Sequence, residues 1–383
     1  MDVKKLRIGI IGSLWISIPP KGFGYGSQQY IVYHLAQLLK KKGHDVTLFA
    51  SKDSHVSTKL VSIIDKQVMD IKSSDTRINE MFELLNLSEG YRRHKDFDII
   101  HNHLLPFGLL FPQITKTPTV HTLHHAIYSK EIKADYYLYQ QNKEQNFISI
   151  SNQQRKIVPQ LNYVSTVYNG VDPDFYMFKE KPENNYWLYI GRLKRYKGIH
   201  TTISLAKKFG INLKIATNLP HASQNDYLDV KDYWEKEIKP QLGSGIEYIG
   251  LVDGKEKIAL LQNAKALLFP VEREEPFGMT LIEAMSCGLP VIAYARGAVP
   301  EIIKDGETGL LVNPSDDDIR GDWIIKKTGI EGLSEAVDRI YAASDEQYLK
   351  MRYNCRKLVQ EKFTVEKMVD EYERVYKLIL GAV

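Results

Sequence analysis

Short runs of apolar residues alternate along this chain with longer stretches in which apolar residues recur every three or four positions. The runs have the length of buried strands, and the stretches between them have the periodicity of amphipathic helices. This alternation predicts an α/β protein whose parallel strands are covered by helices on both faces. In the first half we expect strands at residues 6–12, 46–50, 98–101 and 119–123, with a helix over residues 28–42.

The pattern begins again in the second half, with expected strands at residues 187–190, 213–216, 247–249, 266–269, 291–294 and 310–312. A polar stretch around Pro182, residues 179–185, has the composition of a linker. We therefore predict two Rossmann-like, doubly wound domains that face each other, formed by residues 1–182 and 183–363. Apolar residues at helical spacing predict a helix in the last segment, 364–383.

Composition and charge exclude several classes of protein. The 383 residues are 43% apolar and 26% charged, as in ordinary soluble globular proteins. The net charge of +4 is too balanced for a dedicated nucleic-acid binder. Residues 1–182 carry 23 Lys and Arg against 17 Asp and Glu, so an anionic acceptor or surface would meet the first half more readily.

The two cysteines, Cys287 and Cys355, are too few for a disulfide framework, which favours a reducing, cytoplasmic location. The basic start and the apolar run over residues 8–18 superficially look like a secretory signal. Glycines and prolines interrupt this run and no cleavage site follows it, so we interpret it as a first strand and its loop. No stretch approaches the ~20 apolar residues that a membrane-spanning helix needs.

The most informative window for chemistry is residues 275–290. Pro276 and Gly278 break the chain after a strand, and a helix is expected from about Met279 to Gly288. The unpaired N–H groups at the start of this helix favour an anion such as phosphate. Two carboxylates beside a phosphate cannot both bind it, so Glu275 and Glu283 suit sugar hydroxyls on either side.

Two further loops are candidates for ligand binding. Residues 191–198 directly follow an apolar strand, and Arg192 and Lys197 in this loop can bind phosphate oxygens. The glycine-rich loop of residues 22–29 could be read as a dinucleotide fingerprint with Asp53 as the ribose partner. That reading is disfavoured, because the loop begins about ten residues after the strand ends, whereas the fingerprint needs a tight turn.

Nine of the 11 histidines lie in the first half. They have no acidic or cysteine partner at a recognised spacing, so we expect packed histidines and one that faces a cleft, and no metal site. Asp172 and Asp174 look like the aspartate pair that binds a metal in some sugar transferases. Because they follow Asn169-Gly170, a turn is the better interpretation.

Taken together, these windows resemble the family-4 retaining glycosyltransferases of the GT-B fold over nearly the whole chain. Glu275 and Glu283 are similar to the family's E-x7-E signature, and Arg192 with Lys197 to its basic pair. Further matching segments occur in the family's order at residues 98–101, 122–124, 169–172, 297–301 and 305–309.

The resemblance implies a nucleotide-sugar donor held mainly by the second domain. Glu283 would bind the ribose, Arg192 and Lys197 the diphosphate, and Glu275 the transferred sugar. Backbone N–H groups of Phe277, Gly278, Met279 and Thr280 would assist at the phosphates. His124 matches the family's histidine beside the donor sugar, and Gly26 and Ser27 would lie at the phosphates. Ser27 and Gln29 stand where the family usually has Gly and Glu. The last helix would cross back to the first domain.

The resemblance also implies a metal-independent, retaining transfer of a hexose-type sugar from a UDP- or GDP-sugar. The acceptor would be a hydroxyl of a glycan, a lipid-linked molecule or a small molecule. The alternatives are a nucleotide-sugar epimerase of the same fold, an NAD(P)-dependent Rossmann oxidoreductase, and a transferase fold that only binds. Basic clusters at residues 40–42 and 92–95 suggest the hypothesis of peripheral contact with an anionic membrane, and no nucleic-acid partner is expected.

Overall fold

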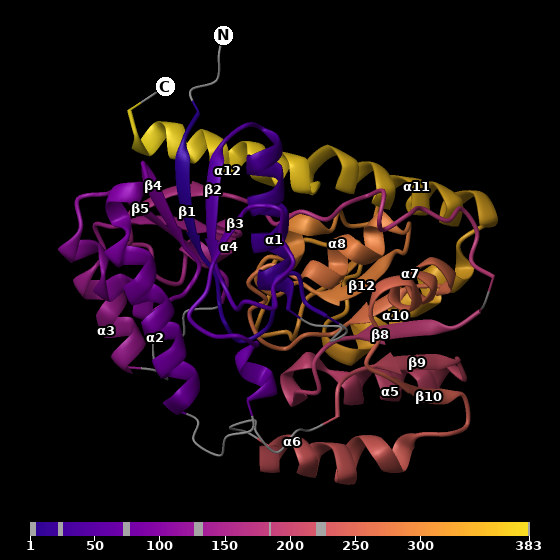
Figure 1. The fold of residues 1–383 in the computed structure, drawn as a ribbon. Coiled ribbons are helices and arrows are strands. Elements are labelled where there is room, and N and C mark those ends of the chain that lie inside the picture. The colour runs from indigo at the N-terminus through magenta and orange to yellow at the C-terminus, as the bar shows by residue number, and fades with distance from the viewer. Residues whose placement is uncertain are drawn as a thin grey trace. The chain divides into compact units, whose positions relative to one another are not determined.

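The computed structural model describes residues 5–21, 26–71, 77–125, 133–183, 185–219 and 227–381. Contacts group these residues into two units, each built on one parallel sheet (Figure 1). The first unit contains the described residues up to Gly170 and those from Val365 onward, and the second contains Val171–Thr364. The predicted α/β, doubly wound organisation is confirmed.

The first unit holds a seven-stranded sheet in the order β3-β2-β1-β4-β5-β6-β7, with every neighbouring pair parallel. Its strands are β1 (Arg7–Ile11), β2 (Asp45–Phe49), β3 (Lys59–Val61), β4 (Ile99–Asn102), β5 (Thr119–Leu123), β6 (Asn146–Ser149) and β7 (Tyr163–Thr166). The central strands are buried on both faces, as a sheet covered by helices requires.

The helices of the first unit include one from the far end of the sequence. They are α1 (Ser27–Lys41), α2 (Arg77–Arg92), α3 (Lys133–Gln141), α4 (Asn152–Arg155) and α12 (Val365–Ile379). Helix α12 lies against α1, as Figure 1 shows in yellow and indigo. Tyr372 and Tyr376 of α12 are fully buried, and Glu373 forms an ion pair of 2.7 Å with Lys42. The apolar face of the last helix is thereby covered within this unit.

The second unit holds a six-stranded sheet in the order β10-β9-β8-β11-β12-β13, again with parallel neighbours. Its strands are β8 (Trp187–Ile190), β9 (Leu213–Ala216), β10 (Ile246–Gly250), β11 (Leu267–Phe269), β12 (Val291–Tyr294) and β13 (Gly309–Val312). The strand order reverses at β8 and β11. The carboxyl ends of these two strands are therefore the place where a ligand is expected in such a sheet.

The helices of the second unit are α5 (Ile199–Phe209), α6 (Tyr227–Tyr233), α7 (Gly254–Asn263), α8 (Met279–Ser286), α9 (Val299–Ile302), α10 (Gly329–Ala342) and α11 (Asp345–Lys362). Helices α5 and α10 contribute to the main core of this unit, whereas α8 packs against α7 and α11. Because right-handed crossovers run in opposite directions from β8 and β11, α5 and α8 lie on opposite faces of the sheet.

The segment that links the two sheets packs with the second unit from Val171 onward, whereas the sequence-based boundary lies after residue 182. The ring of Phe178 stacks on that of Tyr353 with centroids 5.0 Å apart. The backbone N–H of Lys179 donates to the carbonyl of Cys287 at 3.3 Å. These contacts join the start of the polar stretch to α11 and to the end of α8.

Candidate functional site

The loop after β8 carries the predicted basic pair. Arg192 is exposed, and one of its guanidinium nitrogens lies 3.4 Å from the hydroxyl of Tyr196. Gly198 ends the short 3₁₀ turn Arg195–Lys197 with φ +77°, and a Cβ there would lie 2.3 Å from the carbonyl oxygen of Pro270. Only glycine lets this loop approach the chain after β11 so closely.

Lys197 and Glu275 come from these two neighbouring loops and form an ion pair. The Lys197 Nζ lies 2.5 Å from Glu275 Oε2, and the side chains are 14% and 12% exposed. An ammonium has three donors, and the carboxylate occupies one of them. Lys197 therefore keeps two donors for the oxygens of an anion while Glu275 fixes its position.

Helix α8 begins beside this pair. Gly278 precedes it with φ +99°, a left-handed conformation that favours glycine. Within the described part of the chain, no acceptor faces the backbone N–H groups of Gly278, Met279 and Thr280. Phe277 is 2% exposed and its ring packs on Phe363, so its side chain belongs to the core. The start of α8 thus offers amide donors for an anion.

Glu283 lies one turn further along α8 and is nearly buried. Its Oε1 accepts a hydrogen bond from the Tyr176 hydroxyl at 3.0 Å, and its Oε2 lies 2.6 Å from the Nζ of Lys257 on α7. A carboxylate has about four acceptor sites. Two partners therefore leave Glu283 with capacity for further hydroxyl donors, and Lys257 offsets the cost of burying its charge.

Lys257 and Tyr176 were not predicted from the sequence. Lys257 lies in an unremarkable amphipathic helix, and Tyr176 in the segment before the predicted linker. Both lie far from Glu283 in sequence, so no local spacing could have connected them to it.

The predicted residues of the first unit lie after β5 and at the start of α1. His124 Nε2 is 2.7 Å from His103 Nδ1, and the two rings are stacked. Gly26 precedes α1 with φ +108°, and Ser27 is the exposed first residue of that helix. Gln29 is buried. Gly22, Phe23, Gly24 and Tyr25, the rest of the predicted glycine-rich loop, lie outside the described residues.

Histidines of the first unit form a buried polar network. His101 contacts the Tyr376 hydroxyl at 2.6 Å and the Thr122 hydroxyl at 2.7 Å. His121 accepts from Asn102 at 2.9 Å and donates to Gln145 at 2.6 Å, so the proton of its neutral ring is on Nε2. These hydrogen bonds hold the rings of His101 and His121 in fixed orientations.

The charged form of each of these rings is disfavoured. Burial lowers the pKa of His101, His103 and His124 well below the ordinary value, and neighbouring histidines lower each pKa further. Burial lowers the pKa of His121 to about 4, although its bond to Gln145 opposes this shift. At neutral pH His124 therefore carries no positive charge.

Two other motifs have structural explanations. The Asp172 carboxylate accepts the backbone N–H groups of Asp174 at 2.8 Å and Phe175 at 3.3 Å, as the predicted turn requires. Asp53 Oδ2 accepts from the backbone N–H of Gln67 at 3.3 Å. In the described ranges, no three His, Cys, Asp or Glu side chains are grouped as a metal site.

The basic clusters considered for membrane contact are partly neutralised. Lys42 pairs with Asp370 and Glu373, and Arg92 and Arg93 both pair with Glu89. None of the helices that the structure describes is both long and apolar enough to cross a membrane.

Comparisons with known proteins match both halves of the chain. The family model Glycosyltransferase Family 4 matches residues 28–175, and the model Glycosyl transferases group 1 matches residues 174–358. The O-antigen chain mannosyltransferase C of Escherichia coli is 22% identical over 384 aligned positions, which cover 93% of this chain and 95% of that protein.

Solved structures share the fold over almost the full length. The sucrose-phosphate synthase of Thermosynechococcus elongatus has a TM-score of 0.79 and 20% identity, covering 99% of this chain and 100% of its own. Anabaena HepE, solved in complex with UDP and glucose, has a TM-score of 0.69 and 16% identity, covering 96% of this chain and 98% of its own.

Proposed function

The chain is a family-4 glycosyltransferase of the GT-B fold, and we propose that it moves a hexose from a nucleotide-diphosphate sugar to an acceptor hydroxyl with retention of anomeric configuration. The observation that carries this proposal is the pairing of Lys197 with Glu275 at the carboxyl ends of β8 and β11. One loop there supplies cations, and the next supplies a carboxylate and the start of a helix.

Stabilisation of the leaving diphosphate is the main task of these groups. As the bond between the sugar's C1 and the β-phosphate oxygen breaks, negative charge grows on the phosphate. Lys197, Arg192 and the free amides of Gly278, Met279 and Thr280 supply the opposing charge and donors. We propose that transfer needs no metal ion for this reason.

Attack from the same face accounts for retention without a protein nucleophile. The acceptor oxygen forms the new bond to C1 on the face from which the diphosphate departs. The proton of the acceptor hydroxyl passes to a phosphate oxygen of the leaving group, which balances the step. In this step Glu275 accepts hydroxyls of the transferred sugar.

Glu283 is suited to the ribose of the donor. Its remaining acceptor sites match two adjacent hydroxyls, while Tyr176 and Lys257 hold the carboxylate in place. The choice between UDP and GDP is left to experiment: HepE was solved with UDP and glucose, whereas the Escherichia coli relative is a mannosyltransferase. The acceptor is a glycan, lipid-linked or small-molecule hydroxyl, and the free, buried Cys287 and Cys355 fit a cytoplasmic enzyme.

The test is a donor screen with product analysis. Wild-type protein is incubated with UDP-, GDP-, ADP- and TDP-hexoses and a set of glycan, lipid-linked and small-molecule hydroxyl acceptors, with and without EDTA. Nucleotide release and the anomeric proton signal of the product are recorded. We expect the enzyme to prefer donors with one nucleobase. The anomeric carbon of the product should have the same configuration as in the donor, and EDTA should not change the rate. An isomerised sugar nucleotide with no acceptor product would support the epimerase instead.

A further inference from the structure

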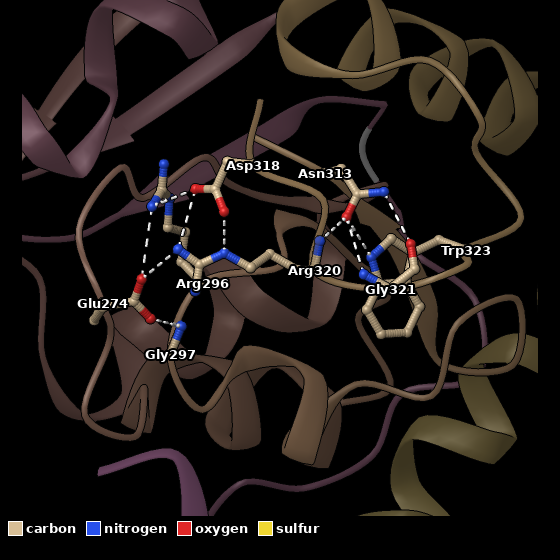
Figure 2. Close-up of polar contacts among 8 residues, drawn as sticks. All are labelled: Glu274, Arg296, Gly297, Asn313, Asp318, Arg320, Gly321 and Trp323. Carbon is tan, nitrogen blue, oxygen red and sulfur yellow. Dashed lines mark hydrogen bonds and ion pairs between the residues drawn. The ribbon is translucent and has the colours of Figure 1, made fainter. Parts of the chain in front are cut away.

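Four charged side chains beside the Glu275 turn form a closed ring of alternating sign (Figure 2). Glu274 Oε1 lies 2.9 Å from Arg320 and 3.6 Å from Arg296, and Asp318 lies 2.8 Å from Arg296. The remaining side is a two-point contact between Arg320 and Asp318. We call these four residues the charge ring. Each charge in it faces two of opposite sign.

The charge ring connects to Glu275 through the backbone. Glu274 Oε2 accepts the N–H of Gly297 at 2.6 Å, and the carbonyl of Glu275 accepts the N–H of Ala298 at 2.8 Å. A Cβ on Gly297 would lie 2.2 Å from the carbonyl oxygen of Glu275. The loop after β12 is therefore in direct contact with the turn that presents Glu275.

The other half of the charge ring belongs to the loop after β13, which is itself fixed. Asn313 Oδ1 accepts from the backbone N–H groups of Arg320 at 2.7 Å and Gly321 at 3.2 Å, and from the Trp323 ring at 3.1 Å (Figure 2). Three donors on one oxygen hold the Arg320 backbone in place. The Arg320 side chain, whose guanidinium pairs with Glu274, therefore extends from a fixed backbone.

The charge ring differs from an ordinary surface ion pair. Its side chains are between 21% and 29% exposed, whereas Lys326 and Asp322 in the same loop form a pair with 70% and 92% exposure. Exposed pairs contribute little, while a partly buried, cyclic set holds its geometry. The exposed pair therefore provides a matched control.

We propose that the charge ring positions Glu275 for the transferred sugar, with Arg320 as the positioning residue that joins the loop after β13 to the turn. This inference rests on the proposed function, because it assigns a purpose to the geometry around Glu275. In this proposal the four residues of the charge ring do not bind the donor themselves. They act through the backbone of Glu274 and Gly297.

The experiment compares Arg320→Met, Arg320→Lys, Asp318→Asn and the control Asp322→Asn with the wild type. For Arg320→Met we expect kcat to fall between about 10- and 100-fold, because a small displacement of a positioning group has that effect. The KM for the donor should change less than about twofold, because Lys197, Arg192 and Glu283 are unaltered. Lysine should restore part of kcat, and Asp322→Asn should behave as wild type.

Hydrogen exchange at the amides of Gly297 and Ala298 gives a readout that needs no substrate. Faster exchange in Arg320→Met and Asp318→Asn, together with the loss of kcat, supports the proposal. Unchanged exchange, unchanged kcat, or an equal loss in Asp322→Asn overturns it. If the wild type transfers from no nucleotide sugar, the proposed function fails, and exchange alone then decides whether the charge ring holds the turn.

Discussion

The two sheets end in polar groups of different kinds. At the ends of β4 and β5 the first unit buries histidines that are neutral and bonded to one another, to hydroxyls and to amides. In the second unit Glu275 pairs with Lys197 at the ends of β8 and β11, and Glu283 of α8 pairs with Lys257 of α7. A neutral network can orient a ligand but cannot oppose a full charge. For this reason we propose that the second unit binds the anionic diphosphate.

The largest expected effect comes from Lys197→Met in the second unit. Without this ammonium the leaving phosphate loses a charged donor, and kcat/KM should fall about 100- to 1,000-fold. Steady-state kinetics with the preferred donor measures it, and Lys326→Met is the matched exposed control. Comparable activity in Lys197→Met and wild type would contradict the proposal that the charged groups of the second unit bind the diphosphate.

Loss of Lys257 tests the second ion pair through stability. Lys257→Met leaves the nearly buried Glu283 without a cation, so the free energy of unfolding should fall by about 3 kcal/mol. Urea denaturation measures this change. Adding Glu283→Gln to Lys257→Met should recover part of the loss, and Lys255→Met on the same helix should be neutral. No recovery in the double variant would mean that the pair is not coupled.

The neutral histidines make the first unit sensitive to acid. The pKa of His121 is about 4 in the folded protein and about 6.5 when exposed, so the unfolded chain binds the proton more readily. Stability should therefore fall with decreasing pH, by about 2 kcal/mol between pH 7 and pH 5 from His121 alone. Pulse proteolysis of the first unit in urea measures this slope, which His121→Gln should reduce.

Glu83 in the same unit should act with the opposite sign and a smaller effect. It accepts from the Ser13 hydroxyl at 2.6 Å and from the Leu14 N–H at 3.1 Å, and burial raises its pKa to about 7. Its folded pKa lies above its unfolded one, so its contribution to stability is lost as pH rises from about 4.5 to 7. Because solvent still reaches part of this side chain, we expect the free energy of unfolding to fall by only about 1 kcal/mol.

Glu83→Gln keeps an acceptor and removes the titration. The same proteolysis assay should show that this variant gains more stability than wild type as the pH rises from 5 to 7, because only the opposing contribution of Glu83 is removed. An unaltered pH slope in Glu83→Gln would show that this carboxyl does not titrate in that range.

The sequence predicted the strands, helices and turns that produce a clear local pattern of apolar residues or glycines. Every buried, apolar strand from β8 to β13 was found within about a residue or two, as were α8 and the glycine turn before it. Strands β6 and β7 were missed because they carry polar residues such as Asn146, Ser149 and Thr166, and β3 has only three residues. Apolar periodicity gives little signal for such strands.

The residues of the candidate site also differ in whether a local sequence pattern could predict them. Arg192, Lys197, Glu275 and Glu283 could be picked out because each belongs to a short motif at a strand end or helix start. Lys257, Tyr176 and Arg320 could not, because their roles arise from contacts between segments far apart in the chain. The assigned roles of all these residues remain predictions for the experiments above.

The most direct test of the central claim is calorimetric titration of wild type, Lys197→Met and Lys326→Met with UDP, GDP, ADP and TDP. We expect wild type and Lys326→Met to bind one nucleoside diphosphate equally well, and Lys197→Met to bind it at least about tenfold more weakly, since a charge-assisted bond to phosphate is lost. Equal affinity in all three proteins, or no binding by wild type, would contradict the assignment of the diphosphate to the ion-paired strand ends of the second unit.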